Sequence, residues 1–590
     1  MHLVQSFPNR SRARLHPLAL ALSASLAFAS SHVESKASLR AGGASRITVD
    51  NCDDSGPGSL RAAVASAVSG DFIDFAPSIP CSVVSLTSGP VVIANGVDGL
   101  PLAELAIYAS VQTPVTIDGG GLDRVFVQDA GNDAVLRLGD LTVAHGKSDA
   151  SGGCIFASGS VLLSGVEVSS CVAGTASGDT TSGGPAIRGG ALYARESAFL
   201  VDSVITANRV YGGASYAYGG GIFAGSVLHA ENSTITNNVA LSTGGAAYGG
   251  GLAAGDRSAY IQSTVTLLST LVSSNTSDSR CSFCGSRGGG VWTYGNTTST
   301  GGEIEGNTAS SLYGYGTGGG LYFNARSNAP PVGATANGTQ FHCNSADLGG
   351  GIAAGGDLVI SGAILDCNIA TNDGGAIELF GGDLAMSGSS IVGNLAMGRG
   401  GGIFVFGYGD AAITNSTISG NVATDGGALG NTYGTLHLAN ATISDNQAFS
   451  HGGGIYFRYP YYAIDLKSTI VAGNRSGSGT TVPEDLWPPG MTVTGSHDLV
   501  VAASGVSLPA DTLDVDPLLQ TLMMNGGATL TQALGDGSPA IDAGDNPLDL
   551  ATDQRGDGFV RVYGSAADIG AFEVQPGAPA DRIFANGFDA

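Results

Sequence analysis

The sequence predicts an all-β protein: a right-handed, single-stranded parallel β-helix with a short helical N-terminal cap and a small C-terminal module. The first observation is a phrase of two glycines, a small residue and an aliphatic residue, which recurs eleven times between Gly152 and Gly452. The last four intervals between these phrases are 25 or 26 residues. The second observation is an asparagine about 19 to 26 residues after nearly every start. Units with such a period must stack on one another to bury their apolar faces.

Each unit contains two or three short runs of alternating apolar and polar residues. Examples are Gly221–Ala224 and Val227–Thr236, which are separated by turn-forming residues. Alternation with a period of two predicts strands, and no run has a 3.6-residue period long enough for a helix. Parallel strands stacked about 4.8 Å apart would place equivalent residues of successive units above one another.

The repeated asparagine is expected at a corner of each coil. Asparagine tolerates the left-handed backbone conformation, and its side-chain amide can bond to the same amide one coil above. We therefore interpret these residues as a structural ladder, in which Cys171 takes the first place. The asparagines are Asn208, Asn238, Asn275, Asn307, Asn344, Asn368, Asn394, Asn421, Asn446 and Asn474.

Three parts of the chain resemble known families. The Gly-Gly-Ala/Gly-Ile phrase with a later Ile-x-x-Asn, over about residues 150 to 475, resembles the repeat of polymorphic outer-membrane proteins, which implies a β-helical surface protein. Here Ile or Val mostly replaces the usual Phe. The stretch Ser55–Arg61 is similar to the start of many exported bacterial β-helix proteins. The C-terminal region resembles a "choice-of-anchor" domain, which implies envelope attachment. The segments that carry this resemblance are Asp516–Leu519, Asn525–Gly527, Gly537–Gly544, Thr552–Gly556 and Asp568–Glu573.

The ends of the chain predict export and capping. Residues 1–29 combine three arginines, a short apolar stretch and small residues before Ala29, which indicates a signal peptide. In residues 30–95, the Ala-rich stretch Leu60–Val68 after Ser59 predicts a helix that caps the β-helix of residues 96–480. The module of residues 481–575 is expected to close the other end. Residues 576–590 are a linker and tail, either a sorting tag or a frayed terminus.

Charge and hydropathy exclude several classes of partner. The formal net charge is −25, so nucleic acid, which binds clustered Lys and Arg, is not an expected partner. No segment has the roughly 20 apolar residues of a membrane helix. The expected location is the outer-membrane surface or the extracellular space. No cofactor is predicted: calcium is compatible with an acidic chain, but no specific motif supports a calcium or other metal site.

Eight cysteines in an exported chain predict disulfides. Cys343 and Cys367 each precede a ladder asparagine in adjacent units, so stacking would bring their Cα atoms within disulfide range. A reduced, stacked pair is the alternative. The other expected pairs are Cys52 with Cys81, Cys154 with Cys171, and Cys281 with Cys284 in a C-x-x-C loop. A redox or metal role for that loop is the alternative, but zinc would need two more ligands.

An aromatic residue follows the glycine phrase in seven of the eleven units. If the preceding aliphatic residue points inward, this residue points outward. Exposed, stacked rings suit the apolar faces of sugars along a polymer. The alternative is mutual stacking under the insertions that contain Tyr211, Tyr216, Tyr218, Tyr313 and Tyr315. The row consists of Phe156, Tyr193, Phe223, Trp292, Tyr322, Phe404 and Tyr456.

A row of charged residues immediately precedes the glycines of the last units. Asp373, Arg399, Asp425 and His451 are each 26 residues apart, and Glu378 projects nearby. Stacking would place the two aspartates about 9.6 Å apart, close to the carboxylate separation of an inverting glycosidase. The alternative is attraction between exposed charges of opposite sign, which contributes only a few tenths of a kcal/mol. No other catalytic motif is present.

Three functions remain open on these residues. The favoured one is an exported β-helix protein at the cell surface, adhesive or glycan-binding, without identified catalysis. The second is a polysaccharide-active enzyme, a glycoside hydrolase or lyase, that uses carboxylates on the face of the β-helix. The third is a purely structural envelope protein. A polysaccharide or a host or cell surface is the expected partner, and the sequence does not indicate an oligomeric state.

Overall fold

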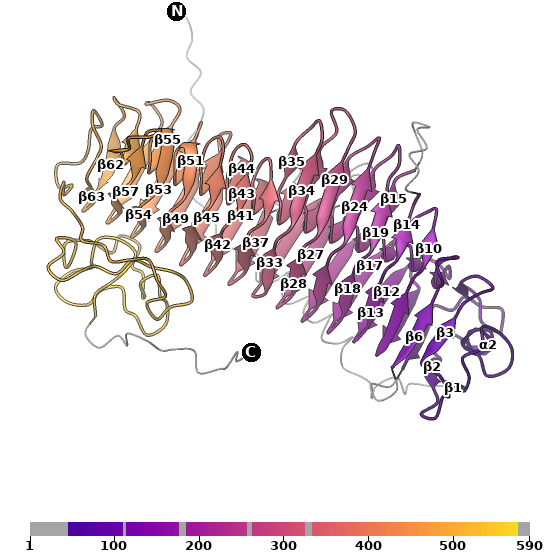
Figure 1. Ribbon diagram of the computed structural model, residues 1–590. Helices are drawn as coiled ribbons and strands as arrows, with labels where there is room; N and C mark the ends of the chain where they lie inside the picture. Colours follow the sequence, from indigo (N-terminus) through magenta and orange to yellow (C-terminus); the bar gives the residue numbers. More distant parts are fainter. Residues whose placement is uncertain (1–44, 110–113, 176–184, 256–261, 325–332, 576–590) are drawn as a thin grey trace, which may run out of the picture.

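The computed structural model describes residues 45–109, 114–175, 185–255, 262–324 and 333–575. The predicted signal peptide and the C-terminal tail lie outside these residues. Short parallel strands stack into long sheets that run the length of the molecule (Figure 1). Within the described residues, the four longest sheets contain 16, 15, 14 and 13 strands, and one helix is present. The prediction of an all-β parallel β-helix with a short helical cap is confirmed.

One coil near the C-terminal end illustrates the winding. It consists of β48 (Ile403–Val405), β49 (Ala411–Thr414), β50 (Thr417–Ser419) and β51 (Val422–Asp425). The next coil begins with β52 (Leu429–Asn431), which pairs with β48 in parallel, Ile403 opposite Leu429. The inward side chains of each strand fill the interior, as Ile403, Ile413 and Ile418 do with no exposed surface.

The asparagines form a continuous ladder at the corner after each third strand. Asn421 donates from its side-chain amide to Asn446 Oδ1 at 2.9 Å and accepts from the amide of Asn394 at 2.9 Å. The backbone N–H groups of Asn394 and Asn421 also donate, each to the side-chain Oδ1 of the asparagine in the next coil. The ladder begins where Cys171 N donates to Asn208 and ends where Asn474 donates to a carboxylate.

The left-handed corner position is not occupied by the ladder asparagine itself. In successive coils the residue immediately before it has a positive φ, as Asn237 (57°) and Cys367 (61°) do. This leaves the asparagine with its side chain turned inward and buried, where its amide satisfies backbone carbonyls such as Ile391 O. The tolerance of asparagine for the left-handed region therefore does not explain its place in the ladder.

The N-terminal end is capped by α2 (Leu60–Ser66). The Ser59 hydroxyl accepts a hydrogen bond from Ala62 N, as an N-cap does, and Leu60 and Val64 are buried. The stacking already begins in this region, because β1 (Arg46–Val49) pairs in parallel with β2 (Phe72–Phe75). The helix therefore lies against coils that start well before residue 96.

All four predicted disulfides are confirmed. Cys343 and Cys367 join adjacent coils with Cα atoms 4.4 Å apart, and Cys154–Cys171 is fully buried. Cys52–Cys81 and Cys281–Cys284 are the other two. Disulfides are typical of exported proteins. Among the described residues no helix is long and apolar enough to cross a membrane.

The expected C-terminal module of residues 481–575 divides into two parts, of which only the first lies at the end of the β-helix. The last coil ends with β62 (Val493–Ser496) and β63 (Leu499–Val500), and Ala503, Val506 and Leu508 pack against the end of the core. The residues that follow fold back along one side of the last coils (Figure 1). They contact β46 (Ser390–Val392), β50, β54 (Thr442–Ser444) and β58 (Ile470–Ala472) or the turns before them.

Candidate functional site

The aromatic row does not form the exposed surface that the alternation predicted. The rings of Phe156, Tyr193 and Phe223 are stacked, with centroids 5.2 and 5.6 Å apart. Phe223, Trp292, Tyr322 and Phe404 are at most 5 % exposed, and Phe156, Tyr193 and Tyr456 are half-buried. The row cannot offer a continuous platform of rings to a polymer.

Insertions cover the row in its middle part. The short strands β20 (Ala217–Tyr218) and β25 (Ala247–Tyr248) belong to a separate sheet of five strands. The rings of Tyr218 and Tyr248 lie 5.4 and 5.1 Å from Trp292. The rings form a second apolar cluster outside the main core, which agrees with the alternative of mutual stacking under the insertions. The prediction of exposed rings was wrong because alternation within a strand does not reveal what folds over it.

The charged row comes together as predicted by the register. Arg399 donates to Asp373 from its guanidinium at 2.7 Å and from its backbone N–H at 2.7 Å. Arg399 forms a backbone bridge with Asp425, and Asp425 pairs with His451. The Arg399 guanidinium also lies 4.2 Å from the centre of the Phe404 ring. Asp373 is only 6 % exposed. Its ion pair with Arg399 is therefore not the weak attraction between solvent-exposed charges that the alternative interpretation assumed.

Glu378 is as buried as Asp373 but has no ion pair within the described residues. It lies on β44 (Ile377–Gly381), one coil before Phe404, and is 6 % exposed. Its Oε2 atom is buried and has no hydrogen-bond partner. Burial, and secondarily the charge of Asp373, raises the pKa of Glu378 to about 8, while Arg399 opposes the rise. At neutral pH this side chain is therefore mostly a protonated acid.

Asp425 has a related but weaker perturbation. Burial raises its pKa, and the neighbouring His451 and Arg399 oppose the rise. Its Oδ1 atom is buried without a partner. On the far side, the His451 ring stacks on Trp487 with centroids 4.1 Å apart, and Trp487 pairs with Tyr456. Two carboxyl groups with unpaired oxygens thus flank Arg399.

A cluster of tyrosines lies at the opposite ends of the same strands, and the sequence analysis missed it. Its five members, which we call the tyrosine platform, are Tyr408, Tyr433, Tyr459, Tyr461 and Tyr462. Tyr408 and Tyr433 stack at 5.0 Å, Tyr459 lies 5.7 Å from Tyr433, and Tyr461 stacks on Tyr459 at 5.4 Å. Tyr408 is 81 % and Tyr461 is 73 % exposed.

The platform comes from three successive turns. Tyr408 lies between β48 and β49, Tyr433 between β52 and β53 (Leu436–Ala439), and the other three between β56 (Ile455–Phe457) and β57 (Ile464–Lys467). The residues of the charged row lie before β44, β48, β52 and β56, and the turns with the tyrosines follow the last three of these strands. The outer face of β44, β48, β52 and β56, which we call the C-terminal face, therefore has charges at one edge and exposed rings at the other. The sequence signal was a tyrosine seven or eight residues after the start of the glycine phrase in three successive units.

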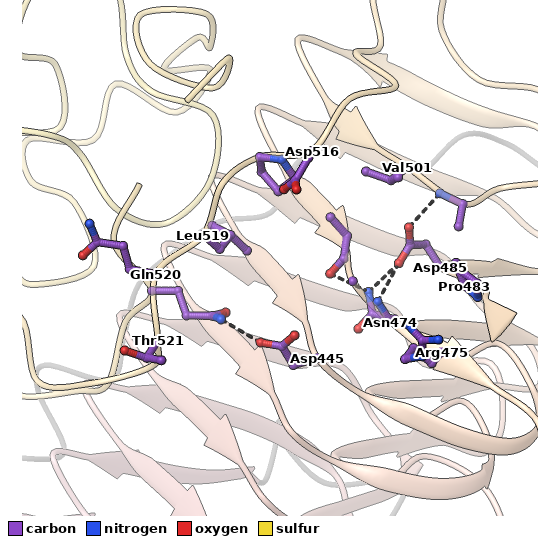
Figure 2. A pocket seen from close by; sticks show the side chains of 15 residues that line it. Asp445, Asn474, Arg475, Pro483, Asp485, Val501, Asp516, Leu519, Gln520 and Thr521 are labelled. Carbon is purple, nitrogen blue, oxygen red and sulfur yellow. Dashed lines mark hydrogen bonds between the residues drawn. The ribbon is translucent and has the colours of Figure 1, made fainter. Parts of the chain in front are cut away.

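A cavity of about 400 Å³ lies between the last coils and the C-terminal module (Figure 2). Asp445, Asp485 and Asp516 line it together with Arg475. Asp485 is fully buried and ends the asparagine ladder: Oδ1 accepts from Asn474 and Oδ2 from Ala502 N. A carboxylate suits this place because no further coil supplies an acceptor for a ladder amide. We interpret this acidic pocket as a structural junction.

The motifs of the C-terminal module are also structural. Arg555 and Asp553 form a fully buried ion pair, and the Arg555 guanidinium lies between the rings of Phe559 and Phe572 at 3.9 and 3.8 Å. Arg561 pairs with Glu573 in the same way. These residues hold the module together rather than forming an open site.

One group of three potential metal ligands lies close together among the described residues: His342, Cys343 and Cys367. The two cysteines share a disulfide, so they have no thiolate to offer a metal ion. His342 instead pairs with Asp366 at 3.0 Å.

Comparisons with known proteins add little to this description. No family profile matches the chain, and no curated protein matches it. Among solved structures, the crystal structure of pectate lyase Pel9A is similar with a TM-score of 0.21 and 16 % sequence identity, covering 90 % of this chain and 98 % of that chain. A score this low says nothing about the chemistry of the present chain.

Proposed function

We propose that the protein is an exported, surface-located β-helix protein that binds a polysaccharide on its C-terminal face. The tyrosine platform carries this proposal. Its rings are stacked, two of them are more than 70 % exposed, and they are spread over three coils. The apolar C–H faces of sugar rings pack on aromatic faces, and a repeat array matches the extended shape of a polymer.

The charged row supports the same location. Hydrogen-bonding groups beside an aromatic surface can bind sugar hydroxyls, and Arg399, Asp425 and His451 lie along the edge of the C-terminal face. Four disulfides support export, and the resemblance of residues 516–573 to the choice-of-anchor domain supports retention at the envelope. A purely structural envelope protein would bind no glycan at all.

The first test replaces two rings of the platform. We expect Tyr408→Ala combined with Tyr461→Ala to weaken binding to the polysaccharide about 30-fold, because each stacked ring contributes about 1 kcal/mol. Affinity electrophoresis through gels that contain one polysaccharide each measures the retention. The full chain should be screened on neutral and acidic polymers.

Tyr313→Ala with Tyr315→Ala is the matched control. These tyrosines are 63 % and 58 % exposed and lie between β34 (Thr308–Ser311) and β35 (Gly316–Thr317), outside the tyrosine platform. The control should be retained like the wild type. Retention that is equal in both double variants, or no retention of the wild type on any polymer, would contradict the proposal.

A further inference from the structure

The C-terminal face also contains two carboxyl groups that the binding of a polymer does not require. Glu378 is 6 % exposed with an unpartnered Oε2, and Asp425 has an unpartnered Oδ1. An unpaired, buried polar atom costs free energy, so such groups are rare in folded proteins and concentrate at functional sites. Glu378 lies on β44 of this face, and Asp425 ends β51, directly before the glycines that lead into β52.

We infer that the protein hydrolyses the polysaccharide it binds, with Glu378 as the proton donor and Asp425 as the base that activates water. This inference rests on the proposed binding function. It differs from the sequence-based pairing of Asp373 with Asp425, because the Arg399 guanidinium holds Asp373 in an ion pair, with a shortest contact of 2.7 Å. Asp373 is then a positioning residue that fixes Arg399 between the two active carboxyl groups.

The spacing of the coils bounds the distance between donor and base. Glu378 pairs with Phe404 in the next coil, and Phe404 pairs with Gly430, which follows Asp425 by five residues. Two coils correspond to a rise of about 9.6 Å along the axis, and Asp425 is also displaced sideways from the stack that contains Glu378. Carboxyl groups are about 6.5 to 9.5 Å apart in inverting glycosidases and about 5 Å apart in retaining ones. A two-coil separation is too long for a retaining pair, so we assign direct attack by water and inversion at the anomeric carbon.

The surroundings of the two groups differ in the direction that these roles need. Burial and the charge of Asp373 raise the pKa of Glu378 to about 8, so it holds a proton at neutral pH. Burial also raises the pKa of Asp425, but both His451 and Arg399 oppose that rise. Environments that separate the pKa values of two carboxyl groups make one the acid and the other the base.

The proposed step balances with water alone. Glu378 gives its proton to the glycosidic oxygen as the bond between that oxygen and the anomeric carbon breaks. The water oxygen bonds to the anomeric carbon and its proton passes to Asp425. Solvent then returns a proton to Glu378 and accepts one from Asp425. The products are two shorter chains, one with a new reducing end of inverted configuration.

The test measures new reducing ends when the full chain is incubated with each polymer of the binding panel. We expect Glu378→Gln to lower turnover about 10³-fold, the scale of general acid catalysis, while retention in affinity gels changes less than about twofold. Glu305→Gln, on a different sheet, is the control and should turn over like the wild type. Turnover should decline above about pH 8, where Glu378 loses its proton.

The outcomes separate the two proposals. Retention without new reducing ends on any polymer would overturn the hydrolase inference and leave the binding function standing. Equal turnover of Glu378→Gln and the wild type, or products that retain the anomeric configuration by NMR, would overturn it as well. No retention and no turnover on every polymer would overturn both proposals.

Discussion

At the scale of single residues, the pKa values of the carboxyl groups depend on how deeply the fold buries each group and how many hydrogen bonds it accepts. Asp485 and Asp498 are 0 % and 1 % exposed, yet both follow polar, turn-like stretches in the sequence. Burial raises the pKa of Asp498 to about 8, opposed by one hydrogen bond from Thr469 N. Its Oδ2 atom has no partner. Burial also raises the pKa of Asp485, but only to about 6, because three hydrogen bonds stabilise its carboxylate where Asp498 accepts one.

Asp498 gives a prediction about stability and pH. Its pKa in the folded protein lies above its ordinary value of 3.8, so the folded state binds more protons between these two values. The free energy of unfolding therefore falls as pH rises through this window. We expect Asp498→Asn to raise that free energy by about 2 kcal/mol or more at pH 8 and by much less at pH 5. Urea unfolding at both pH values measures it, and an equal effect at pH 5 and pH 8 would contradict it.

At the scale of elements, the corner of each coil is stabilised by one repeated side chain. Asn421 is fully buried, and its amide donates to Asn446 Oδ1 and to Ile391 O. Each side-chain amide also accepts a hydrogen bond from the asparagine of the preceding coil. One substitution therefore leaves polar groups without partners in both neighbouring coils. This coupling explains why asparagine recurs at the corner although the left-handed residue is its neighbour.

Asn421→Ala is therefore expected to be costly. Several buried polar groups lose their partners, and each costs about 1 to 3 kcal/mol, so the free energy of unfolding should fall by about 3 kcal/mol or more. The urea midpoint measures the change. Asn296→Ala, an exposed asparagine of β32 (Gly295–Thr300), should shift the midpoint little. A midpoint for Asn421→Ala equal to that of this control would argue against a stabilising ladder.

At the scale of the whole molecule, the C-terminal module determines which side of the β-helix is covered. Gln554 is 4 % exposed and spans the junction: it accepts from Thr417 Oγ1 at 2.6 Å and donates to Ser389 O at 3.2 Å. Outward positions on β50 and β54 are Ser or Thr and are buried there. Small hydroxyl side chains suit a polar, closely packed junction, while the C-terminal face lies on another sheet.

Removal of this contact should loosen the module without unfolding the coils. We expect Gln554→Ala to increase cleavage by protease between residues 500 and 530 several-fold, because buried groups on both sides lose their partners. Limited proteolysis with mass spectrometry measures it. Gln520→Ala, an exposed glutamine of the module, is the control. An unchanged cleavage rate for Gln554→Ala would show that other contacts hold the module in place.

Candidate site residues were only partly predictable from the sequence. The charged row from Asp373 to His451 could be found because it shares the 26-residue period. The protonated state of Glu378 could not be predicted from the sequence, because it depends on burial among neighbouring coils. The tyrosine platform shares this period in part: Tyr433 and Tyr459 are 26 residues apart, and Tyr408 is displaced from their register by one residue because the turns differ in length.

The sequence by itself determined the winding of the chain, the vertical neighbours and, through them, the approach of Cys343 to Cys367. These follow from a short-period repeat, because stacking translates each unit onto the next and places like residues in contact. Only the tertiary structure decided which outward residues remain exposed and where the C-terminal module docks. Trp292 is covered by Tyr218 and Tyr248, and β50 by Gln554. Exposure depends on what insertions and distant segments fold over, and no local period encodes that.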